Sequence, residues 1–120
     1  MKKKKILVVD DEENLRRLFD GELSDEGYAV STARDAETAL AMMKEGVPDL
    51  VTLDVKMPGM GGKEALRAIR ETYPTVPVVV LTAFPEFKAD FDFWAADAYV
   101  VKSSDLTELK GKISYLLGRV

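Results

Sequence analysis

Short, almost unbroken apolar runs recur along the chain, with longer amphipathic stretches between them. Residues 6–9, 50–53, 78–81 and 99–101 form such runs. This composition is typical of strands that are buried on both faces of a parallel sheet. Each run ends on a polar residue, and these residues are Asp10 with Asp11, Asp54, Thr82 and Lys102. The pattern therefore predicts parallel strands with polar groups at their carboxyl ends.

The amphipathic stretches have the spacing of helices, with apolar residues three or four positions apart. We expect Gly27 to end the first helix and Asp35 to cap the second. Asp105 should cap the last helix, because its spacing to Glu108 is that of a capping box. The apolar stripes are Leu15, Leu18, Phe19 and Leu23; Ala36, Ala39, Leu40 and Met43; Leu66, Ile69 and Tyr73; and Leu109, Ile113, Leu116 and Leu117.

Three further segments complete the order of elements. Residues 28–33 alternate as a short strand does, and the aromatic-rich residues 85–96 are predicted to form a helix. Residues 56–62 contain one proline and three glycines, which favours a loop. Strand and helix thus alternate five times. This order predicts a single α/β domain over residues 1–120, with a five-stranded, doubly wound parallel sheet, right-handed crossovers and helices on both faces.

Composition excludes several kinds of chemistry. The chain of 120 residues has neither cysteine nor histidine, so it can hold no disulfide, thiolate nucleophile or zinc-thiolate site. Any phosphohistidine must belong to a partner. The absence of cysteine fits a reducing compartment. A net charge of -4 gives no electrostatic reason to expect direct binding to DNA or to an anionic membrane.

The amino terminus gives no sign of a targeting segment. The lysines at positions 2–5 are interpreted as a solvated lead-in to the first strand. They are not followed by the apolar region of a signal peptide. No apolar stretch approaches the roughly 20 residues that a membrane span requires. We therefore expect a cytoplasmic protein.

The polar residues at the strand ends indicate phosphoryl chemistry. Ligands of parallel sheets bind beyond the carboxyl ends of the strands, so the three carboxylates should meet there. Hard oxygen ligands suit Mg²⁺, which would compensate the charge of Asp10 and Asp11. Asp54 is the best nucleophile, since a carboxylate can attack phosphorus to form an aspartyl-phosphate. Lys102 would neutralise the oxygens of the transferring group, and Thr82 would hydrogen-bond one of them.

Each of these residues also has a plain structural interpretation. An aspartate at the end of a strand is often only a turn former or a helix cap. Thr82 would then be an ordinary strand residue, and Lys102 a solvated side chain. The functional interpretation is favoured because all five polar residues fall at equivalent strand ends.

Four motifs carry a resemblance to a known family. They are Asp10-Asp11 after Ile-Leu-Val-Val, Asp54-Val-Lys-Met-Pro-Gly-Met-Gly-Gly, Leu-Thr82-Ala83 and Tyr99-Val-Val-Lys102, in order over essentially the whole chain. Together they resemble the receiver domain of bacterial two-component response regulators, which has a flavodoxin-like fold. The resemblance implies that Asp54 accepts a phosphoryl group from the phosphohistidine of a sensor histidine kinase or phosphotransfer protein. It also implies that Asp11 and Asp54 ligate Mg²⁺ with the backbone carbonyl of Lys56, and that Asp10 acts mainly through a metal-bound water.

The same resemblance implies a signalling switch that catalyses only its own phosphorylation and dephosphorylation. Lys102 would pair with the phosphate, Thr82 would move toward it, and Tyr99 would swing inward to fill the space. These changes would remodel the face formed by the fourth and fifth helices and the fifth strand. That face would address a downstream effector domain or protein, or a second copy in a phosphorylation-dependent dimer. The output would be a population shift between two states.

The chain departs from the family pattern near Lys102. Ser103 follows it, where most members have a proline after a cis bond, and a cis bond before a non-proline residue costs roughly 2.5 to 4 kcal/mol. Either the loop holds that strain, or the bond is trans and Lys102 is aimed differently. The interval from Thr82 to Tyr99 is also short for the family, and a glycine is usual near Ala95. We therefore expect a shortened or irregular fourth helix.

Two further residues are expected to modulate the lifetime of the phosphoryl group. Lys56 and Phe84 lie two residues beyond Asp54 and Thr82, at positions that border the path of hydrolytic water in this family. We hypothesise that Phe84 screens the phosphoryl group. Phe84→Ala should then speed dephosphorylation, and an unchanged or slower rate would contradict the hypothesis.

Three other functions stay open at this point. A pseudo-receiver would use the same fold as an interaction surface without phosphorylation, and Ser103 favours it. A Mg²⁺-dependent phosphohydrolase is disfavoured, because the chain has no Asp-x-Asp motif at the nucleophile and little length for a cap. A nucleotide-binding module would need a G-x-G-x-x-G or P-loop pattern after the first strand, which is missing. The sequence fits both a stand-alone regulator and the receiver of a longer protein with an output domain.

Overall fold

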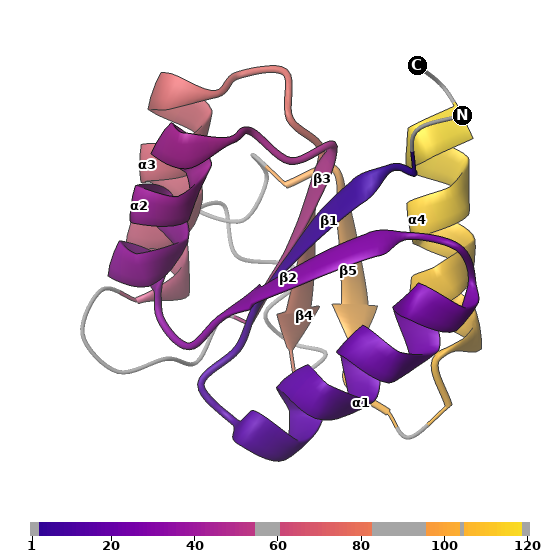
Figure 1. Cartoon of the computed structure of the whole chain (residues 1–120). Helices are drawn as coiled ribbons and strands as arrows, with labels where there is room; N and C mark the ends of the chain where they lie inside the picture. Colours follow the sequence, from indigo (N-terminus) through magenta and orange to yellow (C-terminus); the bar gives the residue numbers. More distant parts are fainter. Residues whose placement is uncertain (1–2, 55–60, 83–95, 104, 119–120) are drawn as a thin grey trace.

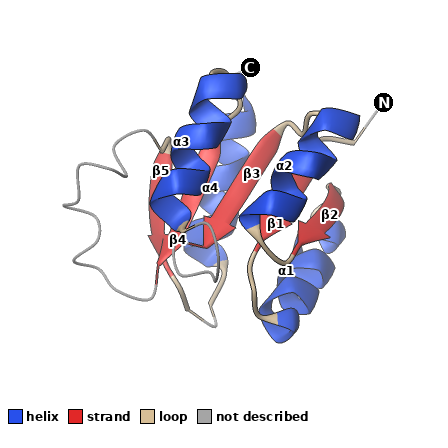
Figure 2. Ribbon diagram, turned by 90° about the vertical axis from the view of Figure 1, so that its left-hand side faces the viewer, coloured by secondary structure: helices blue, strands red, loops and turns tan. Residues whose placement is uncertain are grey.

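A computed structural model describes residues 3–54, 61–82, 96–103 and 105–118 of the chain. Five parallel strands form one sheet in the order β2-β1-β3-β4-β5, which Figure 2 shows from the side of α2 and α3. The strands are β1 (Lys5–Val9), β2 (Ala29–Ala33), β3 (Leu50–Asp54), β4 (Val78–Thr82) and β5 (Ala98–Val101). The predicted five-stranded parallel sheet is confirmed.

Helices cover both faces of this sheet, as predicted. The described helices are α1 (Glu13–Asp25), α2 (Ala36–Glu45), α3 (Gly62–Thr72) and α4 (Thr107–Gly118). α2 and α3 lie against one face, and α1 and α4 lie against the other (Figure 1). The helix predicted for residues 85–96 lies outside the described residues, apart from Ala96. Among the described residues, no helix is both long enough and apolar enough to cross a bilayer.

The core consists of two apolar layers, one on each side of the sheet. β3 and β4 are buried along their whole length. Successive strand residues point to opposite faces, so Val51 packs in the layer under α2 and α3, and Leu50 packs in the layer under α1 and α4. The edge strands β2 and β5 are only partly buried. Three of the four continuous apolar runs therefore mark the central strands, whereas the run at residues 99–101 marks the edge strand β5.

The ends of α1 and α2 follow the sequence signals. Gly27 has a positive φ of 98°, a backbone conformation that glycine adopts without strain, two residues after α1 ends. The Asp35 carboxylate caps α2 by accepting a hydrogen bond of 2.7 Å from the backbone N–H of Thr38. One apolar position differs from the expectation: Leu18 is exposed, because it lies at the edge of the stripe that Phe19 and Leu23 bury.

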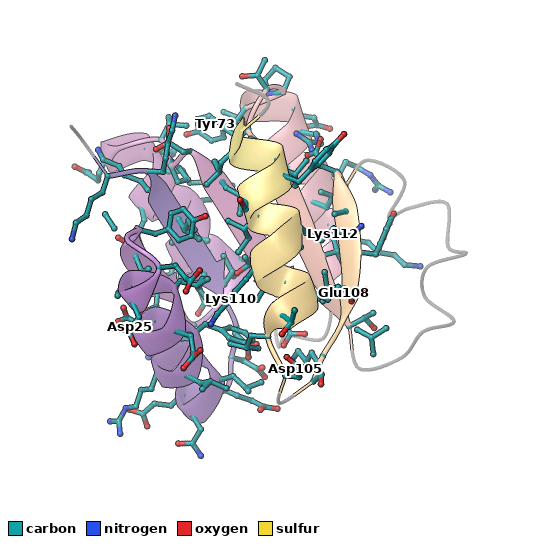
Figure 3. All side chains as sticks on the ribbon, turned by 90° about the vertical axis from the view of Figure 1, so that its right-hand side faces the viewer. Asp25, Tyr73, Asp105, Glu108, Lys110 and Lys112 are labelled. Atoms are coloured by element: carbon teal, nitrogen blue, oxygen red, sulfur yellow. The ribbon has the colours of Figure 1, made fainter. Side chains whose placement is uncertain are left out.

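The predicted capping box of the last helix is partly wrong. α4 begins at Thr107, so Asp105 lies two residues before the first helical residue. Its carboxylate accepts hydrogen bonds from the backbone N–H of Thr107 at 2.9 Å and from the Thr107 hydroxyl at 2.6 Å. Because Thr107 offers two donors to one oxygen, Asp105 bonds there instead of to Glu108. Asp105 still holds the start of the helix (Figure 3).

Polar contacts on the surface join elements that are distant in sequence. Arg70, near the end of α3, donates to the carbonyl of Val76 at 2.7 Å and pairs with the carboxylate of Asp97, just before β5. On the other face, Lys110 points from α4 toward α1 and pairs with Glu22 at 2.7 Å (Figure 3). These contacts link α3 to the segments before β4 and β5, and α4 to α1.

Candidate functional site

The sheet register brings the predicted site residues to one edge. Val9 is paired with Leu53, so Asp10 follows level with Asp54 on the neighbouring strand. The backbone N–H of Lys102 donates to the carbonyl of Thr82 at 2.6 Å. The carboxyl ends of β1, β3, β4 and β5 therefore meet at the same edge, as the sequence predicted.

Burial distinguishes these residues from ordinary turn formers. Among the described residues, four polar side chains are buried, and three of them are Asp10, Asp54 and Thr82. Asp10 is 0% and Asp54 1% exposed, whereas Asp11 is exposed at the surface. A buried carboxylate costs several kcal/mol unless a charge or hydrogen bonds compensate it. The edge therefore needs positive charge.

Lys102 supplies part of that charge. Its ammonium lies 3.0 Å from Asp54 Oδ2 and 3.4 Å from Asp10 Oδ2. Burial works to lower the pKa of Lys102, but the hydrogen bond and charge of Asp54, together with Asp10, outweigh it and raise the pKa above its usual value. None of the described peptide bonds is cis, so the bond to Ser103 is trans. Lys102 reaches both buried carboxylates with this trans bond.

The acidic cluster has the ligand set of a hard divalent cation. Carboxylate oxygens of Asp10, Asp11 and Asp54 lie within 4.8 Å of one another. Three carboxylates face one ammonium, so the cluster keeps an excess of negative charge. Asp10 Oδ1 accepts a hydrogen bond of 2.9 Å from the N–H of Glu12, while the buried Oδ2 accepts none from the described residues and has the Lys102 ammonium 3.4 Å away. A buried oxygen in this state, beside two other carboxylates, fits Mg²⁺, which prefers oxygen ligands.

Thr82 and Tyr99 lie on the other face of the sheet from the acidic cluster. Val80 and Tyr99 are paired across β4 and β5, and both pack in the layer under α2 and α3. Thr82 follows Val80 by two residues and so points to the same face. The Tyr99 hydroxyl is buried. Thr82 and Tyr99 therefore lie on the same face of the sheet, next to the acidic edge.

Two predicted residues cannot be placed, and two others were missed. Lys56 and Phe84 lie outside the described residues. Arg16 looked like an ordinary polar position of the first helix, yet its guanidinium donates to the backbone carbonyl of Asp10 at 2.8 Å. Thr52 is buried two residues before Asp54, and its hydroxyl has no hydrogen-bond partner among the described residues. Only the polarity of Arg16 and Thr52 was visible in the sequence, and polarity alone does not indicate such contacts.

The fold and the acidic edge together define a class of protein. The chain belongs to the response regulator receiver domain family, which it matches over residues 6–114. The resemblance seen in the motifs is thereby confirmed, and the family acts in two-component signalling.

Individual relatives agree with this assignment. A curated relative, the probable transcriptional regulator ycf27 of Porphyridium aerugineum, is 38% identical over 122 residues, which are 100% of this chain and 50% of that protein. The chain thus spans about half the length of the curated relatives it matches. The response regulator TrrA of Thermotoga maritima, in complex with Mg²⁺-BeF, is 46% identical with a TM-score of 0.91, covering 94% of this chain and 98% of that chain. TrrA has also been solved in complex with the histidine kinase ThkA. That structure has a TM-score of 0.90 and 46% identity, and the match covers 95% of this chain and 98% of that chain.

Proposed function

We propose that residues 1–120 form a receiver domain that is switched by phosphorylation of Asp54. One observation carries the proposal: a buried carboxylate on a strand end lies 3.0 Å from an ammonium and among two further carboxylates. A carboxylate held in this way is positioned as a nucleophile toward phosphorus, with cationic charge beside it. Neither a turn nor a helix cap requires such an arrangement.

Each residue of the edge has a role in this proposal. Asp10, Asp11 and Asp54 hold Mg²⁺ together with the backbone carbonyl of Lys56, Asp10 mainly through a water. When bound, the ion neutralises charge on the oxygens of the transferring phosphoryl group. Asp54 forms the new bond to phosphorus while the bond from phosphorus to the donor's histidine nitrogen breaks, and the histidine leaves with the donor. Lys102, already beside Asp54, pairs with the phosphoryl oxygens after transfer.

Thr82 and Tyr99 convert the chemistry into a change of surface. The Thr82 hydroxyl moves to donate a hydrogen bond to a phosphoryl oxygen. Tyr99, on the same face of the sheet, then swings inward into the space that Thr82 leaves. The changed surface lies around β5 and α4 and is read by an effector domain, an effector protein or a second copy. The longer transcriptional regulators among the relatives support an effector that is a covalently linked domain.

The phosphoryl donor is proposed to be a phosphohistidine on a kinase or phosphotransfer protein. This chain has no histidine of its own, so that group must come from a partner. The complex of TrrA with the histidine kinase ThkA supports this class of partner. A signalling protein that meets such a partner is expected in the cytoplasm.

The experiment is phosphorylation by a small donor. Wild type incubated with acetyl phosphate and Mg²⁺ should gain the mass of one phosphoryl group by intact mass spectrometry. Asp54→Ala should gain none, and Asp25→Ala, which changes an aspartate of α1 away from the edge, should behave as wild type. Equal labelling of Asp54→Ala would contradict the proposal. An unlabelled wild type would point instead to a pseudo-receiver, and steady release of phosphate from a phosphomonoester would point to a hydrolase.

A further inference from the structure

We infer that Arg16 is a positioning residue for the metal-binding carboxylates, acting through the backbone of the turn between β1 and α1. The inference rests on the proposed function, since it assumes that Asp10 and Asp11 hold Mg²⁺. Arg16 is partly buried, and its guanidinium donates to the backbone carbonyl of Asp10 at 2.8 Å. Within the described part of the chain, its hydrogen bond to the acidic edge goes to this backbone carbonyl and not to a carboxylate.

The polar groups of Asp10 show what this hydrogen bond accomplishes. The backbone N–H of Asp10 donates to the backbone carbonyl of Ala33 at 3.0 Å, and this hydrogen bond extends the pairing of β1 with β2 by one residue. Oδ1 accepts from Glu12, and the carbonyl accepts from Arg16. Three of the four polar groups of Asp10 are therefore held by hydrogen bonds, one to β2, one to the turn and one to α1. Oδ2 is left facing Lys102 and the other carboxylates.

The same hydrogen bond orients Asp11. The Asp10 carbonyl and the Asp11 N–H belong to one planar peptide group, so fixing the carbonyl fixes the direction in which the chain leaves toward Asp11. Asp11 is exposed, and no hydrogen bond to the described residues holds its carboxylate. As far as the described residues show, the backbone of the turn sets its position near Asp10 and Asp54. Without Arg16, the peptide group between Asp10 and Asp11 could rotate.

Arg17 provides a contrast in the same helix. Its guanidinium pairs with Glu13 at 3.0 Å, one helical turn away, and the two side chains are 75% and 65% exposed. Such a surface pair contributes little to stability. The two neighbouring arginines carry the same charge, but only Arg16 contacts the turn that holds the acidic pair. Arg17 is therefore a matched control.

Charge and positioning predict opposite effects of removing Arg16. If Arg16 acted only as a positive charge near the cluster, its loss would reduce repulsion and tighten the binding of Mg²⁺. If Arg16 holds the turn, its loss would weaken the binding, because the carboxylates would lose their orientation. The direction of the change in affinity distinguishes the two roles.

The test is isothermal titration of the full chain with Mg²⁺ alone. Arg16→Met keeps the apolar stem and removes every donor, and it should raise the dissociation constant for Mg²⁺ about tenfold, as is typical when an outer-shell partner of a metal site is lost. Arg16→Lys keeps a donor and should recover part of the affinity. Arg17→Met should stay close to wild type. The initial rate of phosphorylation by acetyl phosphate should fall most in Arg16→Met at low Mg²⁺, with a deficit that shrinks as Mg²⁺ rises.

The outcomes separate this inference from the proposed function. If wild type binds Mg²⁺ while Arg16→Met matches Arg17→Met, or binds more tightly, the positioning role is wrong and the proposed function stands. If wild type binds no Mg²⁺, the proposed metal site fails and the inference fails with it. Urea denaturation without Mg²⁺ checks that each variant is folded. If Arg16→Met does not fold, the Mg²⁺ affinities of Arg16→Lys and Arg17→Lys are compared instead. Weaker binding of Mg²⁺ is then expected only for Arg16→Lys.

Discussion

At the residue scale, Lys102 compensates the two buried carboxylates of the edge. We predict that Lys102→Met lowers the free energy of unfolding in the absence of metal by about 2 kcal/mol, because hydrogen bonds to charged groups contribute on that order and Asp54 would lose the ammonium that lies 3.0 Å away. Added Mg²⁺ should stabilise this variant more than it stabilises wild type, since it would replace the missing positive charge. Urea denaturation with and without Mg²⁺ measures both effects. A variant as stable as wild type without Mg²⁺ would contradict the compensating role.

Thr52 is the opposite case, a buried polar residue whose hydroxyl is not hydrogen-bonded within the described part of the chain. Its hydroxyl lies in the core, with no hydrogen-bond partner among the described residues. Thr52→Val should therefore raise the free energy of unfolding by about 1 kcal/mol, because the desolvation cost of the hydroxyl is removed at nearly constant volume. Val8 is paired with Thr52 and is equally buried. Val8→Thr is thus the matched control and should destabilise the chain in the same denaturation experiment.

Prediction from the sequence gave the correct position for residues at the carboxyl ends of the strands. Asp10, Asp54 and Thr82 were placed at one edge because parallel strands share a direction, and the structure finds them buried there. Arg16 and Thr52 were missed for a physical reason. The hydrogen bond from Arg16 to the Asp10 carbonyl depends on how α1 is oriented over the turn. Whether the Thr52 hydroxyl finds a hydrogen-bond partner depends on its neighbours across the sheet.

At the element scale, the cap of α2 makes stability depend on pH. Hydrogen bonds from Thr38 lower the pKa of Asp35 below its usual value. The folded state therefore binds the proton of this group more weakly than the unfolded state does. The contribution of Asp35 to stability is present above the unfolded pKa of about 3.9 and is lost as pH falls through the lower folded value.

Asp35→Asn tests this pH dependence. Asparagine also caps helices but does not titrate in this range. The variant should lose part of the decline in stability that wild type shows between about pH 5 and pH 2. Thermal unfolding measured across this range by circular dichroism gives the comparison. Identical pH profiles for the two proteins would show that the cap does not contribute in the manner described.

Element boundaries show where local sequence signals end. Asp35 and Gly27 act through contacts within a few residues, so their roles could be predicted from the sequence. The start of α4 could not be predicted in this way, because the Asp105 carboxylate accepts hydrogen bonds from the backbone N–H and the hydroxyl of Thr107 and not from the backbone N–H of Glu108. Both arrangements fit the same local pattern, and only the folded turn distinguishes them.

At the scale of the whole molecule, Asp97 joins parts that are distant in sequence. Its carboxylate pairs with Arg70 and accepts a hydrogen bond of 2.8 Å from the N–H of Val78, so it links α3, β4 and the start of β5. We predict that Asp97→Ala lowers the free energy of unfolding by about 2 kcal/mol, since charged hydrogen bonds are lost. Asp25→Ala should have little effect. Urea denaturation compares the two variants, and equal stability would contradict the linking role.

The overall fold was easier to predict than the contacts that join its parts. Alternation of apolar runs with amphipathic stretches was enough for the parallel sheet and for helices on both faces, because burial on two sides imposes that composition. The pairing of Arg70 with Asp97 joins residues 27 positions apart, and no periodic pattern in the sequence predicts it. The trans bond after Lys102 likewise depends on the folded loop.

The most direct measurement identifies the residue that carries the phosphoryl group. The chain is phosphorylated with acetyl phosphate and Mg²⁺ and then treated with borohydride, which reduces an aspartyl-phosphate to homoserine that tandem mass spectrometry can locate. We predict homoserine at position 54 alone, dependent on Mg²⁺, because the buried Asp54 carboxylate beside Lys102 is the proposed nucleophile. Homoserine at position 10 or 11, or no reduced residue in the folded chain, would contradict the proposed switch.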